Sequence, residues 1–193
     1  MKWFGTQGRH LSDEDLMYRC QQGSDKAFEE LYHRFARRLQ GFFFRQLGGQ
    51  ADVAADFTQD VFLRAYAARH SYREGCNVAT WLFTIAYNLC RNAYRHHQAE
   101  ADYVAQVEAE VEGSTPPVDL EMEQEELDEL LERVLNELPS EMRLLFSLRY
   151  EEELTIPQMA QATGLPEGTI KSRISRTMNI IKQKITQYET YRS

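Results

Sequence analysis

The sequence predicts an all-α protein made of two small helical domains. Apolar residues recur at helical spacing through nearly all of the chain outside residues 101–117, and no useful stretch alternates apolar and polar residues as a half-buried strand does. The run Gly113-Ser114-Thr115-Pro116-Pro117 divides the helical segments into two groups. We therefore expect a four-helix N-terminal domain at residues 1–98, an acidic linker at 99–120, and a smaller domain with a helix-turn-helix at 121–193.

Four helices are expected in the N-terminal domain. Ser12, Ser24 and Asn77 stand where they can cap the first, second and fourth helices. Gly48-Gly49 ends the second helix, and the third extends from about residue 52 to 69. The residues expected to face inward are Leu16 and Cys20 in the first helix; Phe28, Leu31, Tyr32, Phe35, Leu39, Phe42 and Phe43 in the second; Val53, Phe57, Val61 and Ala65 in the third; and Trp81, Leu82, Ile85, Ala86, Leu89 and Ala93 in the fourth.

The C-terminal domain contains the strongest motif, a helix-turn-helix at residues 154–184. Thr155 can cap its first helix with Gln158 returning the bond, Gly164 supplies the turn, and Pro166 suits the opening of the second helix. In that second helix the expected inward residues are Ile170, Ile174, Met178, Ile181 and Ile185, and the outward ones are Lys171, Ser172, Ser175, Arg176 and Asn179. Cations and small hydroxyls on a helix with an apolar back suit the major groove of DNA.

Two further helices are expected between the linker and the helix-turn-helix. Pro139 opens the second of them. Their inward residues are expected to be Leu127, Leu130, Leu131, Val134 and Leu138 in the first, and Leu145 and Leu148 in the second.

The net charge of -8 conceals an uneven distribution. Residues 1–100 hold 13 Lys+Arg against 11 Asp+Glu, residues 101–141 hold 1 against 14, and residues 142–193 hold 8 against 5. Two mildly basic blocks are therefore joined by a strongly acidic connector, so the overall charge does not exclude binding to nucleic acid.

Other features exclude several classes of protein. No apolar run approaches the roughly 18 residues of a membrane span, and the N-terminus lacks the apolar region of a signal peptide, so we expect a cytoplasmic protein. Cys20, Cys76 and Cys90 form no C-x-x-C pair, and neither a disulfide framework nor a metal site is expected. The absence of a P-loop, nucleophile elbow and dinucleotide fingerprint argues against an enzyme and against a cofactor.

Two polar helix faces are candidates for binding. On the fourth helix, the spacing i, i+3, i+4, i+7 brings together Asn88, Arg91, Asn92 and Arg95. Asn can pair with base edges and Arg attracts phosphates, while nearby aromatic residues, among them Tyr72 and Trp81, suit the stacking of unpaired bases. The third helix instead carries a mixed, partly acidic face that favours a protein partner over DNA, formed by Asp56, Gln59, Asp60 and Arg64.

Four motifs in order resemble one family. They are AFEELYHRFARRL (27–39), DFTQDVFLRAY (56–66), TWLFTIAYNLCRNAYR (80–95) and LPSEMRLLFSLRYEEELTIPQMAQATGLPEGTIKSRISR (138–176). Together they resemble the bacterial extracytoplasmic-function (ECF, group IV) sigma factors of the sigma-70 family. The resemblance implies a region 2 domain and a region 4 domain that bind core RNA polymerase, direct it to a promoter and help to melt the minus-10 element.

The resemblance also implies roles for individual residues and partners. Polymerase is contacted through the clamp helices of its largest subunit and the flap of the second, and an inhibitory anti-sigma factor is a further implied partner. The loop 70–77 falls where the family captures a flipped non-template base. The implied residues are Asp56, Gln59, Asp60 and Arg64 for polymerase; Tyr72, Trp81, Asn88, Arg91, Asn92 and Arg95 for the minus-10 element; and Thr169, Lys171, Ser172, Arg173, Ser175 and Arg176 for the minus-35 element.

Two other interpretations of the sequence differ in what they predict. A stand-alone repressor or activator, with the N-terminal domain as a ligand sensor, would bind duplex DNA tightly without polymerase. A helical adaptor with solvated basic faces would bind no nucleic acid. An enzyme is a more distant third.

The charge distribution leads to a prediction about the free protein. The acidic connector can compete with DNA for the basic faces of the domains, so the isolated chain is expected to bind promoters poorly. Shortening residues 101–115, or neutralising their carboxylates, should raise promoter affinity in a DNA-binding titration. Unchanged affinity would contradict this hypothesis.

Overall fold

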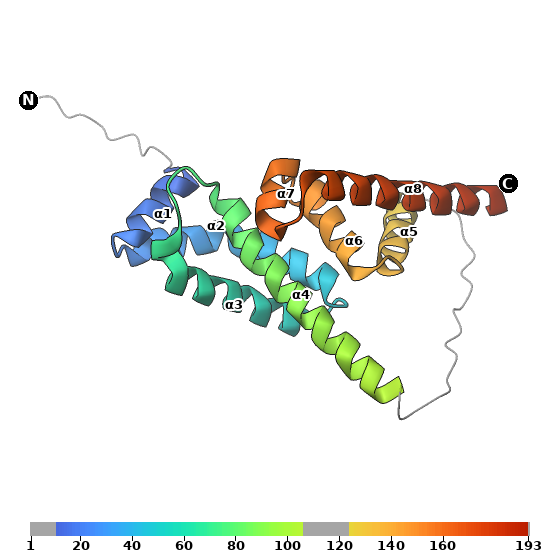
Figure 1. The fold of residues 1–193 in the computed structure, drawn as a ribbon, viewed down its shortest axis with the longest axis horizontal. Coiled ribbons are helices and arrows are strands. Elements are labelled where there is room, and N and C mark those ends of the chain that lie inside the picture. Colours follow the sequence, from blue (N-terminus) through green and yellow to red (C-terminus); the bar gives the residue numbers. More distant parts are fainter. Residues whose placement is uncertain (1–10, 106–123, 193) are drawn as a thin grey trace, which may run out of the picture. The chain divides into compact units, whose positions relative to one another are not determined.

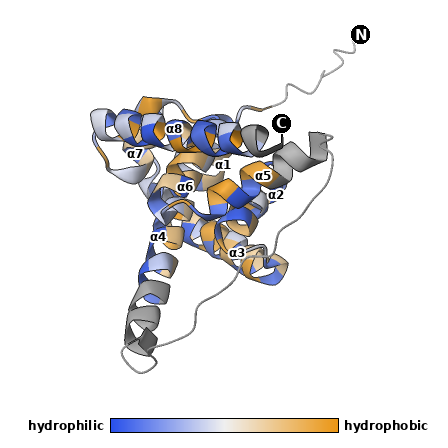
Figure 2. Cartoon of the chain, turned by 90° about the vertical axis from the view of Figure 1, so that its right-hand side faces the viewer, coloured by the Kyte–Doolittle hydropathy of each residue, from blue (hydrophilic) through white to orange (hydrophobic). Residues whose placement is uncertain are grey.

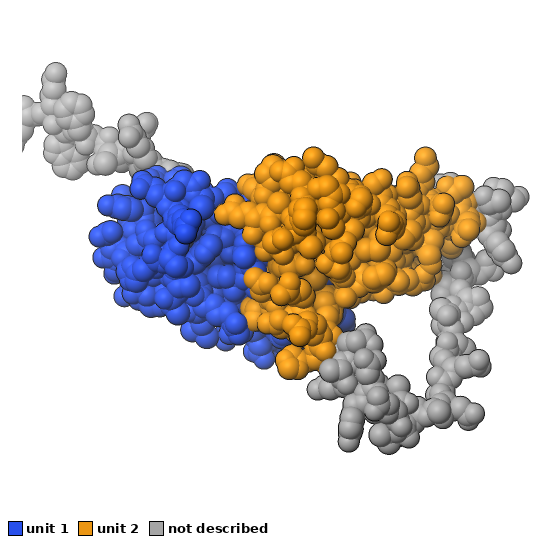
Figure 3. All heavy atoms as spheres, viewed as in Figure 1, with its two compact units in different colours: residues 1–86 blue, residues 87–193 orange. Residues whose placement is uncertain are grey.

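The computed structural model describes residues 11–105 and 124–192, and the ordered elements in these two stretches are all helical (Figure 1). They comprise eight α-helices with no strand, which confirms the all-α prediction. The chain divides into two compact units, Met1–Ala86 and Tyr87–Ser193 (Figure 3). Most of the predicted acidic linker lies outside the described residues, although helix α4 continues through Ala105 into the span predicted as linker.

The first unit contains three complete helices and the start of a fourth. Their bounds are α1 (Asp13–Gln21), α2 (Asp25–Gln46), α3 (Ala51–Ala68), a short 3-10 turn (Arg69–Ser71) and α4 (Val78–Ala105). Of the helices described in the whole chain, none combines the length and apolar character that crossing a membrane requires.

The predicted caps of this unit are confirmed. The Ser12 hydroxyl accepts a hydrogen bond from the backbone N–H of Asp15, whose carboxylate accepts one in return from the N–H of Ser12. Ser24 caps α2, and the Asn77 side chain accepts from Thr80 N at 2.9 Å at the start of α4. Gly48, which follows the end of α2, has a φ of 75°, a conformation that glycine adopts without strain.

The core of the first unit differs from the prediction along α3. The buried residues of this helix are Ala54, Thr58, Val61, Phe62 and Ala65, whereas Val53 and Phe57 are only half-buried. Small residues at three of these positions allow α3 to approach α2 closely, and the Thr58 hydroxyl is satisfied by donating to the Ala54 carbonyl. On α2, Tyr32 was predicted to face inward but is 39% exposed.

The second unit contains the remaining helices. After the last turns of α4 come α5 (Gln124–Asn136), α6 (Ser140–Phe146) with a π-helical turn (Ser147–Glu151), α7 (Ile156–Thr163) and α8 (Glu167–Arg192). The side chain of Leu127 lies outside the described residues. One cluster of the core joins α5, α6 and α8 through Leu130, Val134, Leu135, Leu138, Phe146 and Ile181.

The predicted helix-turn-helix is present as α7 and α8. Thr155 and Gln158 form the expected reciprocal cap, and Gly164 ends α7 with a φ of 73°. Figure 2 shows both hydrophobic and hydrophilic residues along α8. The prediction for Met178 was wrong, because this side chain is 39% exposed and Thr177 is buried instead. The Thr177 hydroxyl donates to the Arg173 carbonyl at 2.9 Å, which removes the cost of burying it.

The cap of α7 provides a stability test. Thr155→Ala removes the side-chain acceptor for the N–H of Gln158, and the free energy of unfolding should fall by about 1 kcal/mol. Urea unfolding of the full chain measures this change, with Ser175→Ala on the exposed side of α8 as the control. Equal stability of the two variants would show that the cap contributes nothing.

Candidate nucleic-acid and protein interfaces

Helix α4 carries an exposed polar stripe opposite buried residues. Asn88, Arg91, Asn92 and Arg95 are all exposed, as the sequence predicted, and Trp81 lies on the same side seven residues before Asn88. The opposite side is fixed by buried residues such as Ala86 and Cys90. Burial raises the pKa of the Cys90 thiol, so that it remains a neutral, apolar packing group. The helix therefore presents two amides and two guanidinium groups to solvent in one row.

The loop before α4 is closed around Tyr72. This residue is 6% exposed, its hydroxyl donates to the Cys76 carbonyl, and its ring meets that of Trp81 edge-on at 5.4 Å. Burial is the main cause that raises the pKa of Tyr72 to about 12, which keeps the phenol a hydrogen-bond donor. Tyr72, predicted as a contact for bases, is thus an internal part of the loop, while Trp81 is only half-buried.

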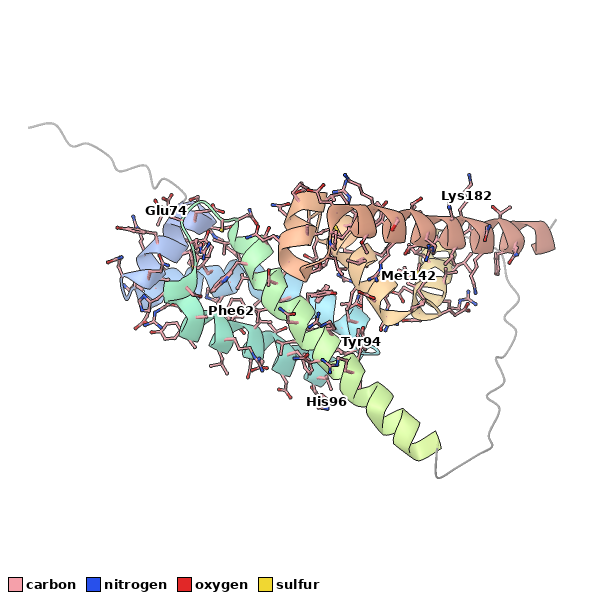
Figure 4. All side chains as sticks on the ribbon, in the orientation of Figure 1. Phe62, Glu74, Tyr94, His96, Met142 and Lys182 are labelled. Carbon is pink, nitrogen blue, oxygen red and sulfur yellow. The ribbon has the colours of Figure 1, made fainter. Side chains whose placement is uncertain are left out.

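The outward surface of this loop is polar. His70, Arg73 and Glu74 are exposed, and Figure 4 labels Glu74 here and His96 further along α4. The Asn77 cap fixes where the loop ends and the helix begins. A compact loop with a buried aromatic centre and a polar rim therefore leads into the polar stripe of α4.

A groove between α2 and α3 was missed by the sequence prediction. Its volume is about 520 Å³ and its lining is formed by Phe28, Tyr32, Gln59, Phe62, Leu63 and Tyr66. The rings pack on one another, with centroids 4.7 Å apart for Tyr32 and Phe62 and 5.0 Å apart for Phe28 and Tyr66. Leu63 is 69% exposed at this groove, which is unusual for a large apolar side chain. The sequence does contain a signal for this groove, because α3 carries apolar residues outside the positions expected to face inward.

The predicted polar face of α3 borders this groove. Gln59 belongs to both, Asp56 is exposed, and Asp60 pairs with Arg64 at 3.0 Å. This ion pair is exposed on both sides, so it contributes little to stability. The combination of an apolar groove and an acidic rim is typical of a surface that binds protein.

The outer face of α8 contains four of the six predicted residues in exposed positions. Lys171, Ser172, Ser175 and Arg176 are exposed, and Lys171 pairs weakly with Glu167 at 3.4 Å. Thr169 and Arg173 are half-buried, and Arg173 forms an ion pair with Glu141 of α6. The guanidinium of Arg173 is therefore engaged in holding α8 against α6, and the exposed cations of the first turns are Lys171 and Arg176.

Two family models match the chain. The model described as Sigma-70 region 2 matches residues 30–100, which include α3 and the polar stripe of α4. The model described as Sigma-70, region 4 matches residues 128–180, which include α7 and the first half of α8.

Similar proteins are found along nearly the full chain. The ECF RNA polymerase sigma-E factor of Haemophilus influenzae is 31% identical over 91% of this chain and 96% of its own length. The corresponding factor of Escherichia coli K12 is 30% identical over 91% of this chain and 95% of its own. Among solved structures, the sigma factor RpoE of Bartonella quintana, bound to the anti-sigma factor NepR, is 25% identical with a TM-score of 0.65 and covers 83% of this chain and 98% of its own.

Proposed function

Because the chain belongs to the extracytoplasmic-function sigma factors of the sigma-70 family, we propose that it binds core RNA polymerase and directs promoter-specific initiation of transcription. The observation that carries this function is the occurrence of both the region 2 and region 4 matches, in order, on one chain. Neither the stand-alone repressor nor the helical adaptor accounts for a region 2 match. The cytoplasm, where polymerase acts, is the proposed location.

Polymerase is proposed to bind at the groove between α2 and α3 and its acidic rim. Apolar side chains with large exposure, such as Leu63, gain from being covered, and Asp56 and Asp60 select a partner with cations beside its apolar face. This proposal adds the groove to the polar residues Asp56, Gln59, Asp60 and Arg64 predicted from the sequence. The partner surfaces are the clamp helices of the largest subunit for this site, and the flap of the second for the C-terminal domain.

The groove can be tested without unfolding the protein. Leu63→Glu should weaken binding to core polymerase by about tenfold or more, because a charge would be buried in an apolar contact. The exposure of Leu63 means that the free energy of unfolding should change by less than about 0.5 kcal/mol.

The matched control is Ala67→Glu, an exposed position one turn further along α3 that does not line the groove. Binding can be measured by the fluorescence anisotropy of labelled chain titrated with core enzyme. Equal affinity of the two variants would exclude the groove from the interface.

Strand recognition is proposed for α4 and the loop before it. Asn88 and Asn92 each supply a donor and an acceptor for the edges of unpaired bases, while Arg91 and Arg95 attract the phosphates. Trp81 is the aromatic residue available for stacking, and Tyr72 is assigned the different role of supporting the loop from inside. An extruded base would be held at the polar rim of this loop.

Duplex recognition upstream is proposed for the outer face of α8. Lys171 and Arg176 provide the charge, and Ser172 and Ser175 allow close approach of the helix to the major groove. Arg173, through Glu141, orients the helix from behind. An anti-sigma factor is a further proposed partner, supported by the Bartonella quintana relative whose structure contains one.

Run-off transcription tests the function. Purified core polymerase is assayed on genomic fragments with and without this chain, and promoter-specific transcripts are expected only in its presence. Asn88→Ala with Asn92→Ala should reduce open-complex formation by about tenfold or more while polymerase binding is retained.

Asp56→Lys with Asp60→Lys should instead weaken binding to core polymerase, and serves as the matched double variant. Specific transcripts without the chain, or tight promoter binding by the chain alone, would contradict the proposal.

A further inference from the structure

One side chain of α1 ties the loop before α4 to the body of the first unit. The amide nitrogen of Gln21 donates two hydrogen bonds, to the carbonyl of Arg69 at 2.8 Å and to that of Tyr72 at 2.9 Å. These carbonyls belong to the first residue of the 3-10 turn and to the residue that follows it. Both amide hydrogens of Gln21 are thus used on the backbone that begins the loop.

Other hydrogen bonds of this turn are local. Ser71 donates to the Ala68 carbonyl, Arg69 donates to the Tyr66 carbonyl, and the N–H of Tyr72 donates to the Arg69 carbonyl. Each of these bonds joins residues three apart, so these bonds tie the turn to itself and to the end of α3, and none of them reaches α1. Gln21, 48 and 51 residues away in sequence, supplies the long-range constraint.

A second residue of α1 reaches the far end of the same loop. The Glu14 carboxylate accepts a long hydrogen bond of 3.4 Å from the N–H of Val78, the first residue of α4. Glu14 and Gln21 are seven residues apart, so they lie on one face of α1, about 10 Å apart along its axis. Helix α1 therefore brackets the loop, with the stronger contact at Gln21.

We infer that Gln21 is a positioning residue for base capture. It holds the turn at Arg69–Tyr72 so that the loop residues 73–77 keep the shape that receives the extruded base. The inference rests on the proposed function of this loop. The two carbonyls require a side chain that can donate twice, because a carboxylate would face two carbonyl oxygens and an apolar side chain would leave both without this donor.

The test separates positioning from general stability. Gln21→Met removes both donors at similar volume, and Gln21→Asn keeps the amide but shortens its reach. Arg34→Met is the matched control, because Arg34 also ties α1 down, through Asp13 at 2.8 Å and the Leu11 carbonyl at 2.9 Å, but does not touch the loop.

Open-complex formation by holoenzyme is measured on promoters that carry each of the four bases at each non-template position of the minus-10 element. At the position where the wild-type chain discriminates most, Gln21→Met should lower the ratio between preferred and other bases by about tenfold, as expected for two lost hydrogen bonds. Gln21→Asn should fall in between, and Arg34→Met should leave the ratio unchanged even if it lowers every rate. An equal ratio in Gln21→Met and Arg34→Met would overturn the inference.

Amide hydrogen exchange of the free full-length chain supplies a measurement that needs no polymerase. Exchange of the Cys76 N–H, which donates to the Arg73 carbonyl within the loop, should be about tenfold faster in Gln21→Met and unchanged in Arg34→Met. Unchanged exchange in Gln21→Met would overturn the inference, and Gln21→Asn decides it if the first variant does not fold. If wild-type holoenzyme forms no promoter-specific open complex, the proposed function fails and the inference falls with it, whereas loss of the Gln21 effect alone leaves that function standing.

Discussion

The burial of one side of helix α4 is the constraint on which the proposed chemistry depends. Val78, Ala86 and Cys90 are fully buried, so the rotation of the helix about its axis is fixed by packing. Fixed rotation keeps Asn88, Arg91, Asn92 and Arg95 in one exposed row. Recognition of unpaired bases needs such preorganisation, because hydrogen-bond geometry tolerates little displacement.

Packing also fixes the shape of the loop at the start of α4 and of the groove between α2 and α3. Tyr72 fills the inside of the loop, Asn77 fixes the first turn of α4, and Gln21 fastens the turn before the loop to α1. At α3, small buried residues such as Ala54 allow the helix to approach α2 closely, whereas Leu63 on the same helix remains 69% exposed. The groove between the two helices is lined by both Leu63 and Tyr32.

Local patterns in the sequence predicted the helices well, whereas contacts between helices could not be predicted from such patterns. Caps such as Ser12 and Thr155 depend on residues three apart, so sequence spacing alone identifies them. The exposure of Met178 and Tyr32 depends on which of two adjacent positions contacts another helix. Helical periodicity in the sequence does not distinguish between two such positions. The interaction of Gln21 joins residues 48 and 51 apart, so no local pattern could indicate it.

For the predicted site residues, too, local spacing predicted some positions and tertiary packing determined others. The exposed polar rows on α4 and α8 followed from helical spacing, but the pairing of Arg173 with Glu141 and the burial of Tyr72 required the packed structure. Family motifs supplied the functional assignment, which neither composition nor spacing contains. What the structure adds is a distinction between side chains that face solvent and side chains that support them.

The proposed roles of α4 in binding the melted strand and of α8 in binding duplex DNA are tested most directly by site-specific crosslinking in the holoenzyme bound to a promoter. A photoreactive residue at position 92 on α4 should crosslink to the non-template strand of the melted minus-10 element, and one at position 176 on α8 to duplex DNA at the minus-35 element. Crosslinks from both positions to the same stretch of duplex, or none from position 92 to unpaired DNA, would contradict these roles.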